Sequence, residues 1–151
     1  MNIHAISRPL SALLVLVLLT AVMNPAMAAP AVEATLYKNP SCQCCDAHAA
    51  YLRGYGFDVT VIESHDLERL KSEHGVPPQL AGCHTILVGG YVVEGHVPAD
   101  VIQQLLRERP DIRGVSLPGM PQGSPGMTGQ KQGPFVIYTI TDDEAKVYAV
   151  A

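Results

Sequence analysis

Three of the four cysteines in this chain, Cys42, Cys44 and Cys45, lie within four residues of one another, directly after a short apolar run. The fourth, Cys83, lies directly before another apolar run. Thiols are the softest ligands that a protein offers, and a group packed this tightly favours either redox chemistry or a soft metal. Because both sites border an expected strand, we expect them to meet in the folded domain.

A copper(I) site accounts best for this crowding. Thiolate sulfur bridges two metal ions, so the three clustered cysteines together with Cys83 provide ligands for more than one Cu(I). Cu(I) accepts low coordination numbers and prefers sulfur and imidazole. Zn(II) requires a tetrahedron, usually built from two separated ligand pairs, whereas the spacing here is three plus one. We therefore predict copper ligands at Cys42, Cys44, Cys45 and Cys83.

Two histidines are candidates for the same site. His84 follows Cys83 directly, so one of the two side chains is expected to face the site and the other to face away, and a ligand role for His84 is one of two open alternatives. His96 precedes an expected helix, where a surface or capping role competes with metal binding. His48 lies one helical turn beyond Cys44, which places it either near the cluster or in solvent.

Two methionines, Met120 and Met127, lie in a loop of glycine, proline and other small residues at 117–129. Methionine usually fills a hydrophobic core, but a loop of this composition has little core to fill. Both thioethers are therefore candidate ligands for Cu(I).

Two other classes of protein remain open. Cys42 and Cys45 have the C-x-x-C spacing of a thiol–disulfide oxidoreductase, with Cys42 as the exposed nucleophile and Cys45 as the resolving thiol. This interpretation gives no role to Cys44, whose thiol would attack or trap a mixed disulfide. The other class is a scaffold with disulfides Cys42–Cys45 and Cys44–Cys83. Whether the protein is an enzyme stays open.

Residues 1–28 are expected to be a signal peptide, and residues 29–151 the mature domain. Arg8 precedes an apolar run at 10–22, which is too short to span a bilayer, and residues 26–28 have a small-x-small cleavage pattern. A single membrane anchor is the alternative. We expect a periplasmic protein, and in that compartment four cysteines would ordinarily form two structural disulfides.

Removal of the signal peptide leaves 123 of the 151 residues, enough for one domain with one core. Because the removed segment carries one charge, Arg8, the net charge changes from −4 to −5. An acidic domain of this kind is a poor ligand for nucleic acid and has no basic patch for a membrane surface.

The expected elements follow the order strand, helix, strand, helix, hairpin, helix and closing hairpin. Strands are predicted at 33–38, 57–62, 85–88, 91–94, 135–140 and 146–150, and helices at 44–55, 67–73 and 98–109. Ser41 is the expected N-cap of the first helix. This order describes a single-domain α/β sandwich of the thioredoxin-like type, in which the cysteine cluster lies where the first strand meets the first helix.

The same residues resemble the small periplasmic copper-resistance proteins of the CopG type, a family long known only as a domain of unknown function. The segments that carry the resemblance are 37–45 (YKNPSCQCC), 82–85 (GCHT), 90–99 (GYVVEGHVPA) and 118–127 (PGMPQGSPGM). The resemblance implies a thioredoxin-like fold, a multinuclear copper site on the four cysteines, and partners such as a copper chaperone or export complex. Two positions depart from the expected pattern, with Gln43 in place of glycine and His48 in place of an aromatic residue, usually tryptophan.

Together these observations predict an exported Cu(I)-binding protein that serves copper resistance. It would sequester the metal, transfer it to an export partner, or cycle it between oxidation states.

Overall fold

The computed structural model describes residues 30–151, so the expected signal peptide at 1–28 lies outside the described residues. The described chain has seven strands: β1 (Val32–Lys38), β2 (Phe57–Glu63), β3 (His84–Val88), β4 (Tyr91–Gly95), β5 (Gly114–Leu117), β6 (Val136–Ile140) and β7 (Val147–Val150). It also has three α-helices and one 3-10 turn: α2 (Gln43–Gly54), α3 (Leu67–Glu73), α4 (Ala99–Glu108) and η1 (Pro78–Leu80).

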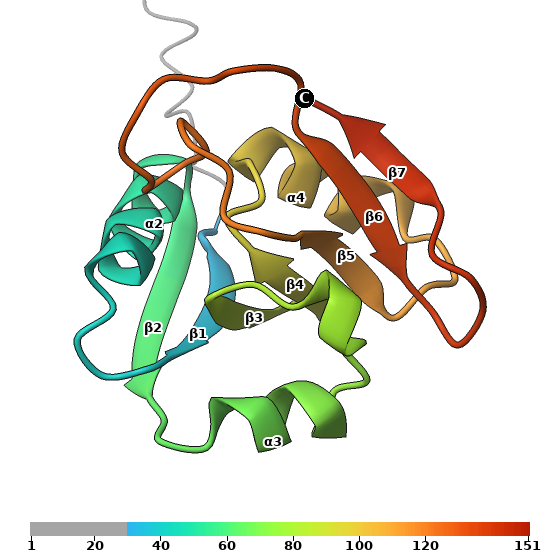
Figure 1. The fold of residues 1–151 in the computed structure, drawn as a ribbon, viewed down its shortest axis with the longest axis horizontal. Coiled ribbons are helices and arrows are strands. Elements are labelled where there is room, and N and C mark those ends of the chain that lie inside the picture. Colours follow the sequence, from blue (N-terminus) through green and yellow to red (C-terminus); the bar gives the residue numbers. More distant parts are fainter. Residues whose placement is uncertain (1–29) are drawn as a thin grey trace, which may run out of the picture. The chain divides into compact units, whose positions relative to one another are not determined.

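All seven strands join one mixed sheet in the order β2-β1-β3-β4-β5-β6-β7 (Figure 1). β1 and β2 are parallel and are connected through α2, whereas β3 and β4 form an antiparallel hairpin that pairs with β1. These pairings confirm the predicted α/β architecture. The thioredoxin-like topology in the narrower sense stays an expectation.

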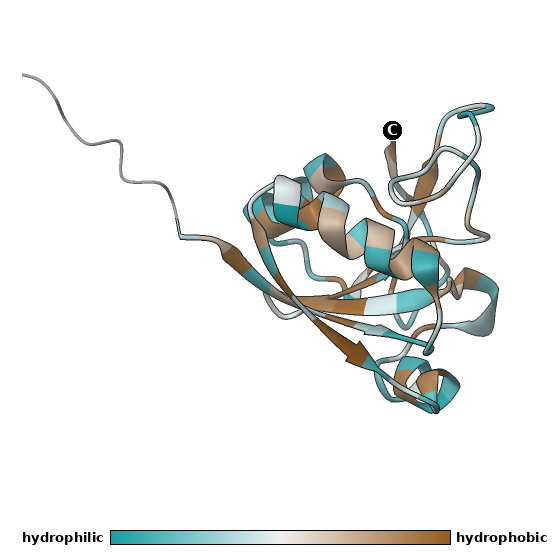
Figure 2. Cartoon of the chain, turned by 90° about the vertical axis from the view of Figure 1, so that its left-hand side faces the viewer, coloured by the Kyte–Doolittle hydropathy of each residue, from teal (hydrophilic) through white to brown (hydrophobic). Residues whose placement is uncertain are grey.

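Helices cover both faces of the sheet. Buried residues of α2 and α4, among them Leu52 and Ile102, share the large core with Leu36 and Val93 of the sheet. A smaller core on the opposite face joins Val92 to the segment around η1. Adjacent residues of β4 thus point into different cores, as the alternation of a strand requires. Figure 2 shows hydrophobic and hydrophilic segments along both the strands and the helices.

β5 is the element that the sequence did not predict. It runs parallel to β4 and is connected to it through α4, so β4, α4 and β5 form a second crossover unit. All four of its residues are buried. Its far edge pairs with β6, which extends the sheet into the predicted C-terminal hairpin of β6 and β7.

The loop at 117–129 therefore belongs to the longer segment between β5 and β6, and strands of the sheet hold that segment at both ends. All described elements belong to one compact unit, Ala31–Ala151. Within the described part of the chain, we find no helix with the length and hydrophobicity needed to cross a membrane.

Candidate metal centre

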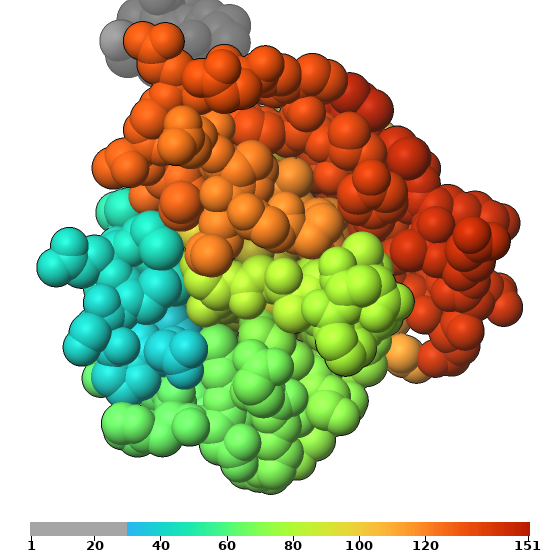
Figure 3. Space-filling model, in the orientation of Figure 1, coloured from blue at the N-terminus to red at the C-terminus, as the bar shows by residue number. Residues whose placement is uncertain are grey.

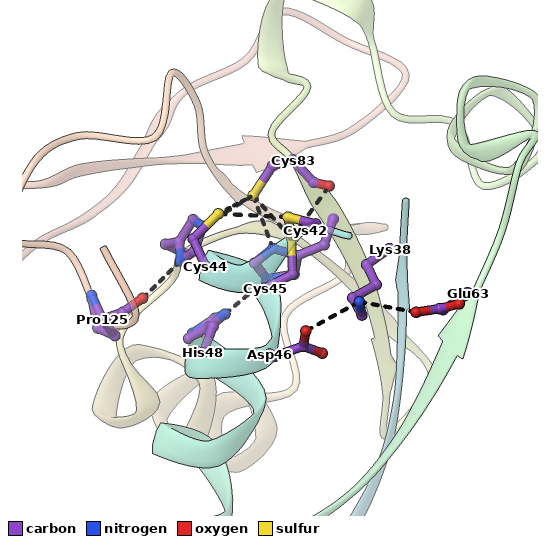
Figure 4. Close-up of a disulfide and its surroundings, with 11 residues drawn as sticks. Lys38, Cys42, Cys44, Cys45, Asp46, His48, Glu63, Cys83 and Pro125 are labelled. Atoms are coloured by element: carbon purple, nitrogen blue, oxygen red, sulfur yellow. Dashed lines mark hydrogen bonds and ion pairs between the residues drawn. A yellow bond between two sulfur atoms is a disulfide. The ribbon is translucent and has the colours of Figure 1, made fainter. Parts of the chain in front are cut away.

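The four cysteines meet at the N-terminal end of α2, as predicted (Figure 4). Cys42 precedes the helix, Cys44 and Cys45 lie in its first turn, and Cys83 comes directly before β3. Cys42 and Cys45 form a disulfide, whereas Cys44 and Cys83 are free thiols. The second disulfide expected for a scaffold, Cys44–Cys83, is not formed.

The spacing of the sulfur atoms suits shared metal ions. Cys44 Sγ lies 3.5 Å from Cys42 Sγ and 4.0 Å from Cys83 Sγ, and Cys45 Sγ lies 3.4 Å from Cys83 Sγ. A metal–sulfur bond is about 2.3 Å long, so two sulfurs on one metal stand roughly 3.8 to 4.6 Å apart. The Cys44–Cys83 separation lies within this range, and the two shorter separations lie about 0.3 to 0.4 Å below it.

The local backbone explains why the cysteines gather at a helix end. Pro40 follows β1 and cannot extend its ladder, and α2 begins three residues later. Cys42 occupies the N-cap, so the prediction that Ser41 caps the helix was wrong; Ser41 lies one residue earlier with a φ of 65°. No side chain caps α2, so its first N–H groups remain free to stabilise thiolates.

The thiol of Cys83 binds its proton tightly. Burial raises the pKa of Cys83 to about 12, and the neighbouring Cys44 contributes in the same direction. This thiol therefore keeps its proton at neutral pH, and a metal ion that bound there would have to displace that proton.

Two glycines allow the loop before β3 to approach the end of β4. A Cβ atom at Gly82 would lie 2.7 Å from Gly95 Cα, and one at Gly95 would lie 2.5 Å from the carbonyl oxygen of Leu117. The backbone at Gly82 lies against that of Gly95, and Gly95 lies against Leu117, so no side chain larger than hydrogen fits at either position. This contact brings Cys83, which follows Gly82, next to His96, which follows Gly95.

The histidines around Cys83 are fully buried. Cys83 Sγ lies 3.0 Å from His96 Nε2 and 3.2 Å from His84 Nδ1. Of the roles left open for His96, the surface role is excluded, since the side chain is 0 % exposed. His48 is also 0 % exposed, and its Nδ1 lies 2.7 Å from His84 Nε2.

Burial keeps these imidazoles neutral. Desolvation lowers the pKa of His48 to about 3, with His96 contributing, and it also lowers the pKa of His84 and of His96. Neutral imidazole has one nitrogen lone pair that can bind a metal. At neutral pH each of the three rings therefore offers a ligand atom.

The loop at 117–129 packs on the first turn of α2 (Figure 3, orange beside turquoise). A Cβ atom at Gly126 would lie 2.6 Å from the backbone nitrogen of His48 and 2.8 Å from the carbonyl oxygen of Cys44. Met127 and Cys44 line the same surface cavity of about 410 Å³. Met120, by contrast, is 42 % exposed at a turn earlier in the loop.

Behind the site lies a buried ion pair that the sequence did not reveal. Lys71 of α3 donates to Glu94 of β4, and both side chains are almost fully buried. Glu94 also accepts hydrogen bonds from Thr85 Oγ1 at 2.7 Å and from the backbone N–H of Gly82 at 2.7 Å. The carboxylate therefore holds the residue directly before Cys83 in place.

A second buried ammonium lies under the first turn of α2. Lys38 Nζ is 3.2 Å from a carboxylate oxygen of Asp46 and 3.3 Å from one of Glu63, and its side chain is 4 % exposed (Figure 4). These two ion pairs connect α2 to the C-terminal ends of β1 and β2. They fix the helix end that carries the cysteines.

This fold and this arrangement of thiols and imidazoles define a small α/β protein with a candidate soft-metal centre at a helix N-terminus. The comparisons with known proteins specify the family. A family model described as "Protein of unknown function, DUF411" matches residues 80–127. Among curated proteins, no sequence matches the chain.

Two solved structures are similar to nearly the whole described chain. Both are structures of a copper resistance protein, CopG, one in Form 1 and the other in Form 2, and both are 38 % identical in sequence with a TM-score of 0.74. They cover 82 % and 80 % of this chain respectively, and 98 % of their own length in each case. The chain belongs to the CopG-type family of copper-resistance proteins.

Proposed function

We propose that this protein is exported to the periplasm, binds more than one Cu(I) ion on the thiolates of Cys42, Cys44, Cys45 and Cys83, and serves copper resistance. The observation that carries the proposal is the convergence of four cysteine sulfurs within 4.8 Å of one another. The similarity to two structures of a copper resistance protein supports copper as the metal. The signal peptide predicted at 1–28 supports export.

Copper loading must be coupled to reduction of the Cys42–Cys45 disulfide. While that bond is intact, two of the four sulfurs are not available as thiolate ligands. A dithiol reductant supplies the two electrons and two protons that convert it into two thiols, and becomes a disulfide itself. Cu(I) then displaces the thiol protons. Copper uptake is thereby restricted to the reduced protein, and a bound ion protects the thiols from reoxidation.

Further candidate copper ligands lie beside the thiolates. His84 and His96 each have a ring nitrogen within 3.2 Å of Cys83 Sγ. Met127 is supported by its place beside Cys44, whereas Met120 rests on the sequence pattern alone. The loop that carries both methionines ends against α2, where a copper chaperone or export complex would reach the metal.

X-ray absorption at the copper edge tests the proposal. The reduced protein, loaded anaerobically, should show copper bound mainly to sulfur together with copper–copper scattering, because bridging thiolates hold the ions close together. Cys44→Ser should lose the copper–copper scattering. Ser41→Ala is the matched control, since it alters the same turn without removing sulfur. Loaded wild-type protein without copper–copper scattering would contradict a bridged site.

One observation favours a second function, that of a metal-independent thiol–disulfide oxidoreductase. The Cys42–Cys45 disulfide joins a partly exposed sulfur to a fully buried one, which is the arrangement of a nucleophile and a resolving thiol. Cys44 Sγ at 3.5 Å from Cys42 Sγ would compete for any mixed disulfide. Turnover in a metal-free insulin-reduction assay, abolished by Cys42→Ser, would support this function over copper storage.

A further inference from the structure

The buried histidines have a hydrogen-bond pattern that fixes where two of their ring hydrogens lie. His48 Nε2 is 3.1 Å from the carbonyl oxygen of Val97, and His96 Nδ1 is 2.7 Å from the carbonyl oxygen of Pro125. A carbonyl oxygen only accepts, so each of these nitrogens must carry a hydrogen. In the neutral rings, His48 Nδ1 and His96 Nε2 therefore carry lone pairs.

The ring of His84 has one hydrogen and cannot donate it both to His48 and to Cys83. His84 Nε2 is 2.7 Å from His48 Nδ1, to which it must donate its single hydrogen. His84 Nδ1 then presents a lone pair to Cys83 Sγ at 3.2 Å, and His96 Nε2 presents another to the same sulfur at 3.0 Å. The thiol of Cys83 has one hydrogen for these two lone pairs. The buried cluster is one hydrogen short.

A cation removes this deficit. We propose that His48, His84 and His96 bind one copper ion of their own through three imidazole nitrogens, next to the ions on the thiolates. In the bound form His84 carries its hydrogen on Nδ1 and donates it to the sulfur of Cys83. The lone pairs of His48 Nδ1, His84 Nε2 and His96 Nε2 then all face the ion.

This arrangement gives every remaining ring hydrogen an acceptor. His48 donates to Val97, His96 donates to Pro125, and His84 donates to the Cys83 thiolate. Histidines that bind metals almost always donate their other N–H to a carbonyl or an anion, which fixes the tautomer and the orientation of the ring. The partners that this pattern requires are already in contact.

The size of the cluster also suits a metal ion. One ligand atom from each of the three rings lies within 4.8 Å of the other two. Metal–imidazole bonds of about 2.0 to 2.1 Å place three ligand nitrogens roughly 3.3 to 3.6 Å apart. The closest pair, at 2.7 Å, must separate by less than about 1 Å, which is within the reach of small ring tilts.

Burial determines the charge of the ion. The cluster is fully buried and consists of neutral imidazoles, so a monovalent ion costs less desolvation than a divalent one. Imidazole is also a good ligand for copper. The choice of Cu(I) over another ion rests on the proposed function, because that function delivers Cu(I) to the adjacent thiolates.

The test compares wild-type protein with His48→Phe, which removes one imidazole and no sulfur. In anaerobic Cu(I) titrations followed by native mass spectrometry, we expect His48→Phe to bind one copper ion fewer than wild type. His65→Phe removes an exposed histidine that belongs to neither ligand group and is the matched control, with wild-type stoichiometry. If His48→Phe folds poorly, His48→Gln replaces it in the test because it keeps a polar side chain. We expect His48→Gln to lose the same ion.

A second readout uses wild-type protein alone. Copper-edge absorption of the fully loaded protein should contain outer-shell imidazole scattering from three rings per histidine-bound ion. Equal copper stoichiometry in wild type and His48→Phe, or loaded wild type without imidazole scattering, would overturn the inference. Cys44→Ser separates this result from the proposed function, because it changes the thiolate-bound copper and leaves the imidazole signal in place.

Discussion

At the scale of single residues, Cys83 connects the two parts of the site. Its sulfur lies 3.4 Å from a sulfur of the disulfide, 4.0 Å from the free thiol of Cys44, and 3.0 Å from an imidazole nitrogen of His96. A change in the protonation or metal binding of this one thiol therefore affects both the thiolates and the histidines.

The buried histidines should make the stability of the metal-free protein depend on pH. Burial lowers the pKa of His48 from 6.5 to about 3. Above pH 6.5 the ring is neutral in both states, but as the pH falls from 6.5 toward 3 the unfolded chain takes up a proton that the folded chain refuses. The stability contributed by this difference is therefore present above the unfolded pKa and is lost toward acid.

We expect the free energy of unfolding to be about 2 kcal/mol lower at pH 5 than at pH 7 from His48 alone, with a further loss from His84. Urea unfolding of the metal-free protein at the two pH values measures this difference. His48→Phe should reduce it by about 2 kcal/mol, whereas His65→Phe should leave it as in wild type. An unchanged pH dependence in His48→Phe would show that His48 is not held neutral.

At the scale of elements, the sequence predicted most of what positions the cysteines. Pro40 and the apolar run before it determine where β1 ends, and the apolar run after Cys83 determines where β3 begins. These two strand ends bring Cys42 and Cys83 together. β5 was missed because Gly114–Leu117 is too short to show an alternation, and its pairing with β4 depends on the crossover through α4.

The sequence offered His84 and His96 as ligands and left the place of His48 open, but it could not show that the three rings meet, because they come from three separate elements. His48 lies in α2, His84 begins β3, and His96 follows β4. Their burial depends on the close contact at Gly82 and Gly95, which is a property of the folded backbone. One feature of the sequence did point to the cluster: His48 lies on the face of a helix that packs on the core, where histidine is rare.

The contact between α2 and the loop at 117–129, which carries Met120 and Met127, should be disrupted by the addition of a single methyl group. Gly126→Ala places a Cβ against the backbone of His48 and Cys44 at a residue with a φ of 83°. We expect a loss of about 2 to 4 kcal/mol in the free energy of unfolding, or release of the loop from α2 detected by faster amide exchange at residues 120–130.

Gly119→Ala is the matched control for this prediction. Its φ is 78°, but a Cβ there meets no atom within 4 Å, so only the backbone strain of about 1 kcal/mol applies. Equal effects of the two substitutions would show that the loop does not press on the helix. Weaker copper binding in Gly126→Ala alone would support a role for Met127 as a ligand.

The ion pair between α3 and β4 should dominate the stability of the loop that carries Cys83. Lys71→Met leaves the buried Glu94 carboxylate without its cation, which we expect to cost about 3 to 5 kcal/mol. Chemical denaturation measures the loss. Arg69→Met is the matched control, because it removes an exposed positive charge from the same helix, where the ion pairs with Asp66 and Glu73 are worth about 1 kcal/mol or less.

A small effect of Lys71→Met would mean that Glu94 is not held as an ion pair. A large effect with normal copper binding in the surviving folded protein would show that the pair supports the fold and leaves the metal ligands undisturbed.

At the scale of the whole molecule, one sheet supports the candidate metal centre and the segments that supply its ligands. α2 and its N-cap bring three sulfurs and one imidazole, the β3–β4 hairpin and the residues that flank it bring the fourth sulfur and two imidazoles, and the loop between β5 and β6 packs against α2. Because the ligands come from separate parts of the chain, copper binding should tie these parts together and raise the stability of the reduced protein.

The measurement that tests the central claim most directly is native mass spectrometry of reduced protein comprising residues 29–151, titrated anaerobically with Cu(I) beside a Zn(II) titration. We expect cooperative uptake of several copper ions by the wild type, a loss of this uptake in Cys44→Ser, and little change in Ser41→Ala. Uptake of no copper, or of one zinc ion held more tightly than copper, would contradict a thiolate-bridged copper site.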